Sequence, residues 1–276
     1  MARQNFFKTV FLTGIHGQYK LWKNELAQYC NYADKIIQFG NVIGCNDFVK
    51  DKKDFGANES VLKYLLLYRA TEENWIQLAG PNEIAALNLP EEWTNKRSRQ
   101  VLRNSWLSST PTMLTSEVHN GRLLTHGGLT YGEWLSIGSP ETAQTASERL
   151  NEKYAGTLHQ GSSVLLGGAP NYSANPIWAD PVLETYPSWL TAPHPLPFSQ
   201  IHSGNTLNSK IGRSFINAEF SPYHYAEKIL YRTYGSHFIK DNEEITALDI
   251  PVEGELISSI PQPYTVYVEK TPLTKD

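Results

Sequence analysis

The chain has 276 residues, of which 40% are hydrophobic and 19% are charged, and it includes 7 Trp, 10 Phe and 15 Tyr. This material is sufficient for the core of one large domain with extensions, and it excludes a disordered chain. Its 24 Lys and Arg against 28 Asp and Glu give a net charge of −4, which argues against a nucleic-acid platform but does not exclude a local basic patch.

Membrane insertion and secretion are both disfavoured by the sequence. No apolar run approaches the roughly 18 residues needed to cross a bilayer, and the first ten residues lack the apolar core of a signal peptide. Two cysteines, Cys30 and Cys45, cannot build a disulfide framework and are expected to be free thiols in a reducing compartment. We therefore expect a protein that is not secreted through a signal peptide and has no membrane partner.

The first third of the chain alternates strand and helix signals. Short apolar runs predict strands over Phe6–Leu12, Asp34–Phe39 and Asn74–Leu78. Apolar residues at helical spacing predict helices over Leu21–Tyr29 and Glu59–Tyr68. This alternation predicts parallel strands with right-handed crossovers. Each strand ends in a glycine-containing turn, so three turns are expected to meet at the carboxyl edge of the sheet, where ligands bind in such folds.

The middle of the chain combines a hairpin and a helix. Pro111–Val118 and Arg122–Thr125 are predicted to pair around Asn120-Gly121, because Asn-Gly suits a type I′ turn. Ser139-Pro140-Glu141 supplies an N-cap, an N1 proline and a first-turn acid, and predicts a helix that runs to about Tyr154.

The remainder is predicted to be a long loop followed by short strands. Gly167–Pro197 is expected to be a loop that covers a site or forms a contact surface. Its acids Asp180 and Glu184 are expected to be solvated, and its aromatic residues are expected to anchor the loop or to contact a partner: Trp178, Tyr186 and Trp189. Strands are predicted at Phe198–Ile201, Ile229–Thr233 and Tyr264–Val268.

Five short motifs carry the functional argument, and each of the first three follows a predicted strand. They read Thr13-Gly14-Ile15-His16-Gly17, Gly40-Asn41-Val42-Ile43-Gly44-Cys45, Gly80-Pro81-Asn82-Glu83, His126-Gly127-Gly128-Leu129 and Gly204-Asn205-Thr206. Their order resembles that of the calcineurin-like metallophosphoesterases, in particular the phosphoprotein-phosphatase branch, over roughly residues 6–210.

The resemblance implies a fold class and a domain division. The expected fold is α/β: a metallophosphoesterase-like αββα sandwich of two mixed sheets flanked by helices, with a β-rich C-terminal extension. Residues 1–210 would form the metallophosphoesterase-like domain, and residues 211–276 would form the extension, packed on that domain or on a partner.

The resemblance also implies a metal site, from which this chain departs. The family holds two divalent metals with Asp and His from the first motif, Asp from the second, Asn from the third and two later histidines. Only His16 and His126 are unchanged among these ligands, and the other four positions are occupied by Gly14, Asn41, Pro81 and Asn205. The general-acid histidine of the family falls on Asn82, and its phosphate-binding arginine falls on Cys45.

These replacements are expected to abolish the two-metal chemistry. Two divalent cations about 4 Å apart repel by roughly 17 kcal/mol at an effective dielectric constant of about 20, and carboxylates must offset that repulsion. Loss of the general acid alone typically lowers a rate about 10²–10⁴-fold. We therefore expect no catalytic residue, no metal and no cofactor, and we interpret five positions as a vestigial site: His16, Asn41, Asn82, His126 and Asn205.

The favoured function is that of a catalytically inactive pseudophosphatase with a protein partner or a homo-oligomeric assembly. It would be a protein-binding or structural subunit, for example of a phage particle, and would be cytoplasmic or virion-associated. One alternative is a residual metal-dependent phosphoesterase that hydrolyses phosphomonoesters or phosphodiesters with a single Zn or Mn ion held by His16, His126 and His202. A third reading, binding of a nucleotide or phosphate without hydrolysis, is the least favoured.

Overall fold

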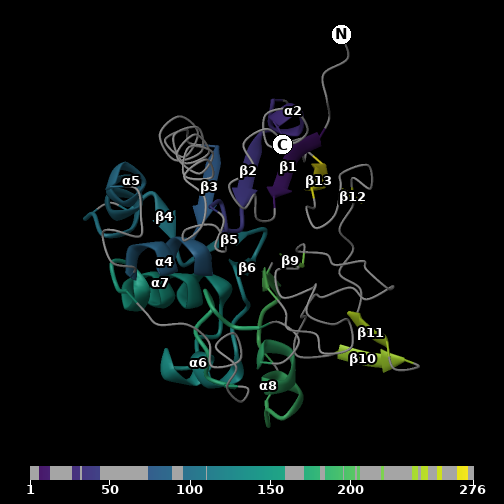
Figure 1. Ribbon diagram of the computed structural model, residues 1–276. Coiled ribbons are helices and arrows are strands. Elements are labelled where there is room, and N and C mark those ends of the chain that lie inside the picture. Colours follow the sequence, from purple (N-terminus) through teal and green to yellow (C-terminus); the bar gives the residue numbers. More distant parts are fainter. Residues whose placement is uncertain are drawn as a thin grey trace.

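A parallel sheet and a smaller mixed sheet, with helices around them, form the α/β architecture of the protein (Figure 1). The computed structural model describes residues 6–12, 27–31, 33–43, 74–88, 96–109, 111–158, 171–180, 184–194, 196–202, 204–205, 219–220, 238–241, 244–247, 254–256 and 266–272.

The larger sheet has the strand order β12-β13-β1-β2-β3-β4. Its four parallel strands are β1 (Phe6–Leu12), β2 (Lys35–Gln38), β3 (Trp75–Leu78) and β4 (Met113–Leu114). The predictions of three parallel strands at the start of the chain are therefore confirmed. The inner parts of these two strands, Thr9–Leu12 of β1 and Ile36–Gln38 of β2, are buried on both faces, as expected for a covered parallel sheet.

The C-terminal strands complete this sheet beyond β1. Strand β13 (Val266–Pro272) pairs antiparallel with β1 over seven residues, from Phe6 opposite Pro272 to Leu12 opposite Val266, and β12 (Gly254–Leu256) pairs with β13. Strand β1 is thus an interior strand, although it is the first element of the chain. The predicted strand Tyr264–Val268 overlaps β13 but ends too early, and its first two residues lie outside the described residues.

The smaller sheet has the order β5-β6-β7. Strands β5 (Ser116–His119) and β6 (Arg122–Thr125) form the predicted antiparallel hairpin, whose turn has the positive φ angles of a type I′ turn at Asn120 (49°) and Gly121 (71°). Strand β7 (Gln200–His202) pairs parallel with β6. Prediction of one strand over Pro111–Val118 was wrong, because β4 belongs to the larger sheet and β5 to the smaller one.

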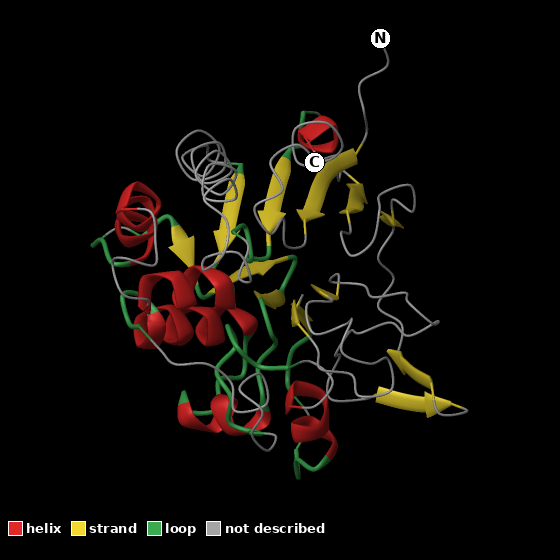
Figure 2. Cartoon of the chain, viewed as in Figure 1, coloured by secondary structure: helices red, strands yellow, loops and turns green. Residues whose placement is uncertain are grey.

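The helices surround these sheets, and two further strand pairs lie in the C-terminal third (Figure 2). The helices are α2 (Ala27–Cys30), α4 (Pro81–Asn88), α5 (Lys96–Trp106), α6 (Tyr131–Ser136), α7 (Ala143–Tyr154) and α8 (Tyr186–Leu190). The strand pairs are β8 (Gly204–Asn205) with β9 (Glu219–Phe220), and β10 (Phe238–Asp241) with β11 (Glu244–Ala247).

The two main sheets share one apolar core. A cluster of fully buried side chains combines residues from both sheets: Phe11, Ile37, Phe39 and Leu78 from or beside the larger one, and Leu124 and Ile201 from the smaller one. A second cluster joins the smaller sheet to α6, α7 and α8, and includes Leu123, Trp134, Leu150 and Trp189. The strand ends of the two sheets are therefore held against each other by packing.

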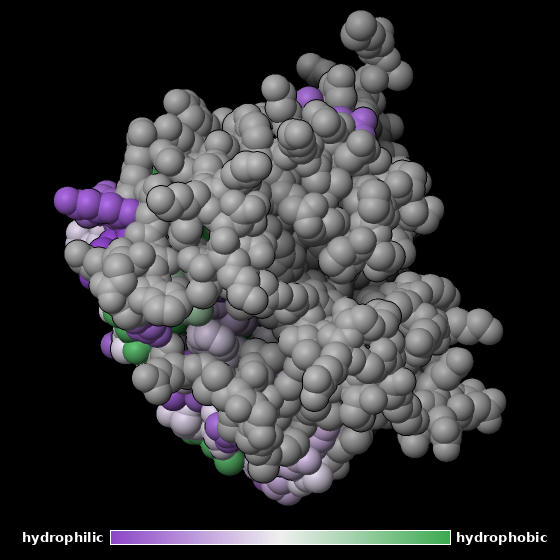
Figure 3. Space-filling view, in the orientation of Figure 1, coloured by the Kyte–Doolittle hydropathy of each residue, from purple (hydrophilic) through white to green (hydrophobic). Residues whose placement is uncertain are grey.

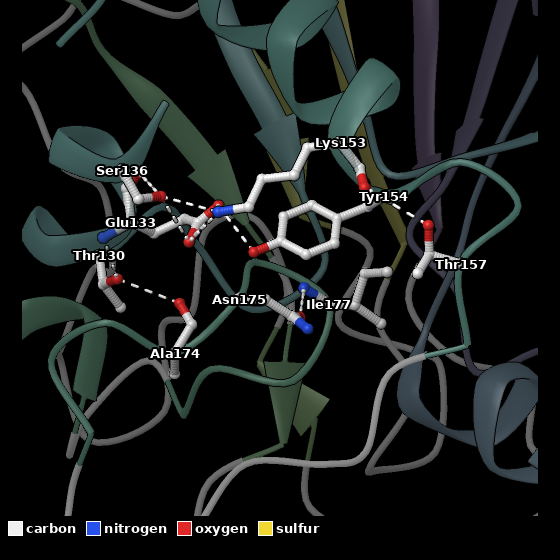
Figure 4. A network of polar contacts seen from close by, with 9 residues as sticks. All are labelled: Thr130, Glu133, Ser136, Lys153, Tyr154, Thr157, Ala174, Asn175 and Ile177. Carbon is white, nitrogen blue, oxygen red and sulfur yellow. Dashed lines mark hydrogen bonds and ion pairs between the residues drawn. The ribbon is translucent and has the colours of Figure 1, made fainter. Parts of the chain in front are cut away.

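A polar network centred on the buried Glu133 connects α6 to α7 (Figure 4). The Glu133 carboxylate accepts hydrogen bonds from Lys153 Nζ (2.9 and 3.1 Å) and from the Tyr154 hydroxyl (2.8 Å). Burial, together with the charge of Glu133, raises the pKa of Tyr154, so its hydroxyl remains a donor. Ser136 adds a further contact, since it accepts from Lys153 Nζ at 2.8 Å.

Three further expectations need correction. Helix α7 is capped by Thr142, whose hydroxyl accepts from the Thr145 N–H, and not by Ser139, which has a positive φ of 50°. Asp180 and Glu184 are fully buried rather than solvated, because Glu184 accepts from the backbone N–H groups of Asn171 and Asp180.

Part of the expected loop over Gly167–Pro197 is the helix α8, whose Trp189 is buried in the core. The predicted helix Glu59–Tyr68 and the predicted strand Ile229–Thr233 lie outside the described residues. Within the described part of the chain, none of the helices has the length and apolar character needed to span a membrane.

Candidate functional site

Four of the residues singled out from the sequence lie together at the ends of strands. Asn41 follows β2, Asn82 lies in the first turn of α4 after β3, His126 follows β6, and His202 ends β7. Asn41 contacts both Asn82 and His126, and His126 interacts with His202. We call these four residues the strand-end cluster. All of them are at least 97% buried.

Two other residues of the proposed vestigial site are not assigned to this cluster. His16, together with Gly14 and Cys45, lies outside the described residues. Asn205 lies in the short strand β8, opposite Glu219, and its side chain is outside the described part.

The turns after β2 and β3 approach each other very closely. A Cβ atom on Gly40 would overlap the backbone nitrogen of Gly80, and the φ of Gly40 is +89°. Asn41 also has a positive φ (51°), a conformation that asparagine tolerates better than most residues. This backbone geometry places the Asn41 side chain directly against α4.

Glu83 holds the two turns together, a role that the sequence analysis did not assign to it. Its carboxylate is fully buried and accepts from the backbone N–H groups of Gly80 (3.0 Å), Asn41 (2.8 Å) and Ile43 (3.1 Å). The pattern that could have revealed this role is Pro at the first and Glu at the third position of α4, which predicts a glutamate that reaches back to the N-cap N–H.

The orientation of the Asn41 amide follows from its neighbours. Its Oδ1 accepts from the backbone N–H of Asn82 at 2.9 Å, so its Nδ2 points the other way, to His126 Nε2 at 3.4 Å. The Asn82 side chain in turn donates to the Ile43 carbonyl oxygen at 2.6 Å.

The tautomer of His126 is determined by the same argument. Its Nδ1 hydrogen-bonds to the carbonyl oxygen of Phe39, which can only accept, so Nδ1 carries the proton. Nε2 is then the acceptor, and Asn41 Nδ2 is the donor to it. The lone pair that a metal would need is directed at an amide N–H group.

His202 is the second histidine of the cluster and is 98% buried. Burial, with a smaller effect of His126, lowers the pKa of His202 to about 4, so this imidazole is neutral at pH 7. Its Nδ1 is buried without a hydrogen-bond partner among the described residues. A Cβ on Gly128 would lie 3.1 Å from the His202 ring, so the His126-Gly127-Gly128 turn is in close contact with the end of β7.

The segment before α8 packs against the His126-Gly127-Gly128 motif. The Gly127 N–H donates to the Pro176 carbonyl oxygen at 2.6 Å, and the Thr185 hydroxyl donates to the Gly127 carbonyl oxygen at 2.7 Å. A Cβ on Gly127 would overlap the Ala179 carbonyl oxygen, so the chain at this point must be glycine. The buried acids Asp180 and Glu184 belong to this segment and stabilise it internally.

The residues of the strand-end cluster do not fit the two-metal centre that the sequence resemblance implies. Glu83, the carboxylate bonded to the turn of Asn41, already accepts three backbone N–H groups, and the Asn41 Oδ1 accepts another. Pro81 has no donor atom to offer a metal. Among the described residues, no group of three or more His, Cys, Asp or Glu side chains is arranged to hold a metal ion.

Comparison with known proteins gives no relative: no family model, curated protein or solved structure matches the chain. The functional argument therefore depends on the geometry of the strand-end cluster and on the residue types found there.

Proposed function

We propose that this chain is a catalytically inactive relative of the calcineurin-like metallophosphoesterases and acts as a protein-binding or structural subunit, for example of a phage particle. In this proposal residues 1–210 form the metallophosphoesterase-like αββα domain and residues 211–276 its extension. The partner is another protein or a second copy of the chain, in the cytoplasm or in a virion.

The contact between Asn41 and His126 carries the proposal. A carboxylate at residue 41 could share a cation with His126, whereas the Asn41 amide presents an N–H group to Nε2 at 3.4 Å. The same amide is fixed by the Asn82 N–H at 2.9 Å. A hydrogen bond thus takes the place of a metal bridge, and the fold keeps its packing without the ions that phosphoryl transfer would need.

A binding role is supported by the apolar surface beside α6. Leu135 is 48% exposed and Tyr172 is 43% exposed. Tyr172 is tied to the start of α6, because the Gly132 N–H donates to the Tyr172 carbonyl oxygen at 2.9 Å. Tyrosine and other aromatic side chains are enriched where proteins contact each other.

Metal analysis and a phosphatase assay on the purified full chain test the proposal. We expect no bound divalent metal after dialysis, and no hydrolysis of p-nitrophenyl phosphate or bis-p-nitrophenyl phosphate with added Mn²⁺. Hydrolysis that depends on Mn²⁺ and is lost in His126→Ala would overturn the proposal.

A second candidate function is favoured by one observation at His202. The buried Nδ1 of His202 has no hydrogen-bond partner among the described residues. The residue also lies near His126, and a single-metal site requires such neighbouring histidines. In this alternative a Zn or Mn ion is held by His16, His126 and His202 in a residual phosphoesterase. Bound metal would raise the melting temperature, with about 2.7 kcal/mol of stabilisation at roughly 100 times its Kd. Absence of any shift with Zn²⁺ or Mn²⁺ would exclude this alternative.

A further inference from the structure

Helix α5 exposes basic residues on its outer face. The helix contains Lys96, Arg97, Arg99 and Arg103 and no acid. Lys96, Gln100 and Arg103 are exposed, and their spacing of four and three residues places them along one face, which we call the basic stripe. Leu107 follows at the same spacing and is 39% exposed.

The cations of the basic stripe have no anion within the described part of the molecule. Arg99 is turned inward and donates to the Leu87 carbonyl oxygen at 3.0 Å, whereas Lys96 and Arg103 form no ion pair with any described residue. Lys96 also lies at the helix N-terminus, where the helix dipole disfavours a positive charge. Among the described residues, the basic stripe therefore has no compensating charge.

Helix α7 shows the opposite arrangement. Glu141 precedes the helix, and Glu148 and Glu152 lie on its outer face at spacings of seven and four residues. We call these three exposed residues the acidic stripe. Glu148 accepts a hydrogen bond from Gln144 at 2.9 Å, but no ion pair is formed by Glu148 or Glu152 among the described residues.

The two cationic side chains of α7 form contacts within the molecule. Lys153 pairs with Glu133 at 2.9 Å, and Arg149 donates to the carbonyl oxygens of Ile137 and Gly138 at 2.7 and 3.0 Å. Glu152 lies in the last turn of α7, where the helix dipole disfavours a negative charge. Within the part of the chain that the structure describes, the acidic stripe thus also lacks a compensating charge.

The two helices that carry the stripes lie near each other. Figure 1 shows α5 and α7 on its left side, and the Trp106 Nε1–H at the end of α5 donates to the Thr157 carbonyl oxygen after α7 at 3.1 Å. Next to this hydrogen bond are two exposed leucines, Leu107 (39%) and Leu158 (41%). In Figure 3 a few hydrophilic side chains are visible at the left edge near α5, and a few hydrophobic ones are visible below them.

We infer that this face binds a second copy of the chain, with the basic stripe of each copy on the acidic stripe of the other. A twofold axis between α5 and α7 brings both helix pairs together at once, and it places the exposed leucines near the centre of the contact. This inference rests on the proposed function, since it names the partner of a scaffold protein as the chain itself.

Charge favours a second copy over a nucleic acid. Without the four basic residues of α5, the chain retains 20 basic and 28 acidic residues, a net charge of −8. That charge repels a polyanion but complements the basic stripe of another copy. The acidic stripe also repeats the seven-residue interval between Lys96 and Arg103.

The test is the mass of the full chain in solution, measured by sedimentation equilibrium at low and at high salt. We expect a dimer at low salt, and a Kd that rises at least about tenfold in about 0.5 M NaCl, because exposed ion pairs are screened. A monomer at all concentrations and salt levels overturns the inference.

Charge reversal makes the test specific. Lys96→Glu with Arg103→Glu, and separately Glu148→Lys with Glu152→Lys, are each expected to abolish the dimer, because like charges then face each other. Mixing the two double variants restores a dimer, since each reversed stripe meets a complementary one. The quadruple variant keeps the wild-type net charge and is expected to dimerise alone. Circular dichroism confirms that each variant is folded.

Three outcomes would contradict the inference. Double variants that dimerise like the wild type would place the interface elsewhere, and double variants that fail to associate when mixed would exclude the pairing of the stripes. Binding of single-stranded DNA by a monomeric wild type, lost in Lys96→Glu with Arg103→Glu, would assign the basic stripe to a nucleic acid. None of these measurements depends on phosphatase activity or metal content, so failure here is distinguishable from failure of the proposed function.

Discussion

Asparagine has an amide NH₂ group where aspartate has a second carboxylate oxygen, and at residue 41 this group lies against His126 Nε2. The Asn41 amide can accept from the Asn82 N–H and donate to the imidazole at the same time. A carboxylate can only accept, so it would face the imidazole lone pair unless a proton or a cation lay between them. The residue therefore determines whether this part of the molecule needs an ion.

Replacement of Asn41 by Asp tests this reading. We expect Asn41→Asp to lower the free energy of unfolding at pH 7 by about 2 kcal/mol, because a buried acceptor replaces a satisfied donor. Urea unfolding followed by fluorescence measures the change. Asn120→Asp is the comparison variant, since Asn120 also has a positive φ (49°) and its Nδ2 contacts His119 Nε2 at 3.2 Å, but the Asn120 side chain is exposed, so we expect a smaller loss of about 1 kcal/mol or less. Equal stability of Asn41→Asp and the wild type would contradict the hydrogen bond from Asn41 Nδ2 to His126 Nε2.

His202 makes stability depend on pH. Its pKa is about 4 in the folded protein, against an ordinary value of 6.5 for a solvated histidine, so the unfolded chain takes up the proton first as pH falls. The stability that comes from burying His202 in its neutral form is fully present above about pH 6.5 and is lost as pH decreases toward 4. At about pH 5 the loss is about 2 kcal/mol, from about 1.36 kcal/mol per pH unit.

The comparison of wild type with His202→Gln at pH 7 and pH 5 isolates this contribution. Glutamine cannot titrate. Between pH 7 and pH 5 the free energy of unfolding should therefore decrease by about 2 kcal/mol less in the variant than in the wild type. An equal pH dependence of the two proteins would show that His202 is not buried in its neutral form.

At the level of elements, the sequence predicted well wherever one local signal was sufficient. The apolar runs of β1, β2 and β3 and the Asn-Gly turn between β5 and β6 require only nearby residues. The start of α7 was missed because Ser139-Pro140-Glu141 satisfies the same capping rules as the true cap, Thr142.

Contacts that no local pattern indicates account for the other failures. Glu184 is expected from the sequence to be a solvated loop acid, but its buried carboxylate accepts from the backbone N–H groups of Asn171 and Asp180 in the same loop. Glu83 was quoted as a motif residue, but its role needs the turn of Asn41, which lies far away along the chain. His202 was placed near the cluster only as one alternative, since its position follows from the pairing of β6 with β7.

The network between α6 and α7 supports a prediction about elements. Removal of the carboxylate in Glu133→Ala leaves the buried Tyr154 hydroxyl without its acceptor, whereas Lys153 is partly exposed and can be solvated, and we expect a loss of about 2 kcal/mol in the free energy of unfolding. Tyr154→Phe removes one hydrogen bond and should cost about 1 kcal/mol.

Thermal and urea unfolding measure both variants of this network. Gln144→Ala on the exposed face of α7 is the control, and it should change stability by less than about 0.5 kcal/mol. A Glu133→Ala variant as stable as this control would show that α6 is held by its apolar contacts alone.

At the level of the whole molecule, the larger sheet depends on both ends of the chain. Val10 of β1 lies opposite Val268 of β13. Val268→Pro removes a backbone donor in β13, which is paired on both sides, and we expect a loss of about 3 kcal/mol or more, the cost of proline inside regular structure. Val268→Thr preserves the backbone and the β-branched shape, and serves as the control.

Hydrogen exchange of the β1 amides provides the readout for these variants. The amides should exchange faster in Val268→Pro and at the native rate in Val268→Thr. Unchanged protection of β1 in Val268→Pro would show that β13 is not needed to hold that strand.

The pairing of Phe6 with Pro272 has a consequence for biosynthesis. During translation, strand β1 can pair with β2 early, but it gains its other neighbour only after β13, more than 250 residues later, has been synthesised. Nascent chains interrupted late in the message would therefore display an open strand edge to one another, and a chaperone that shields such edges would increase the yield of the finished protein.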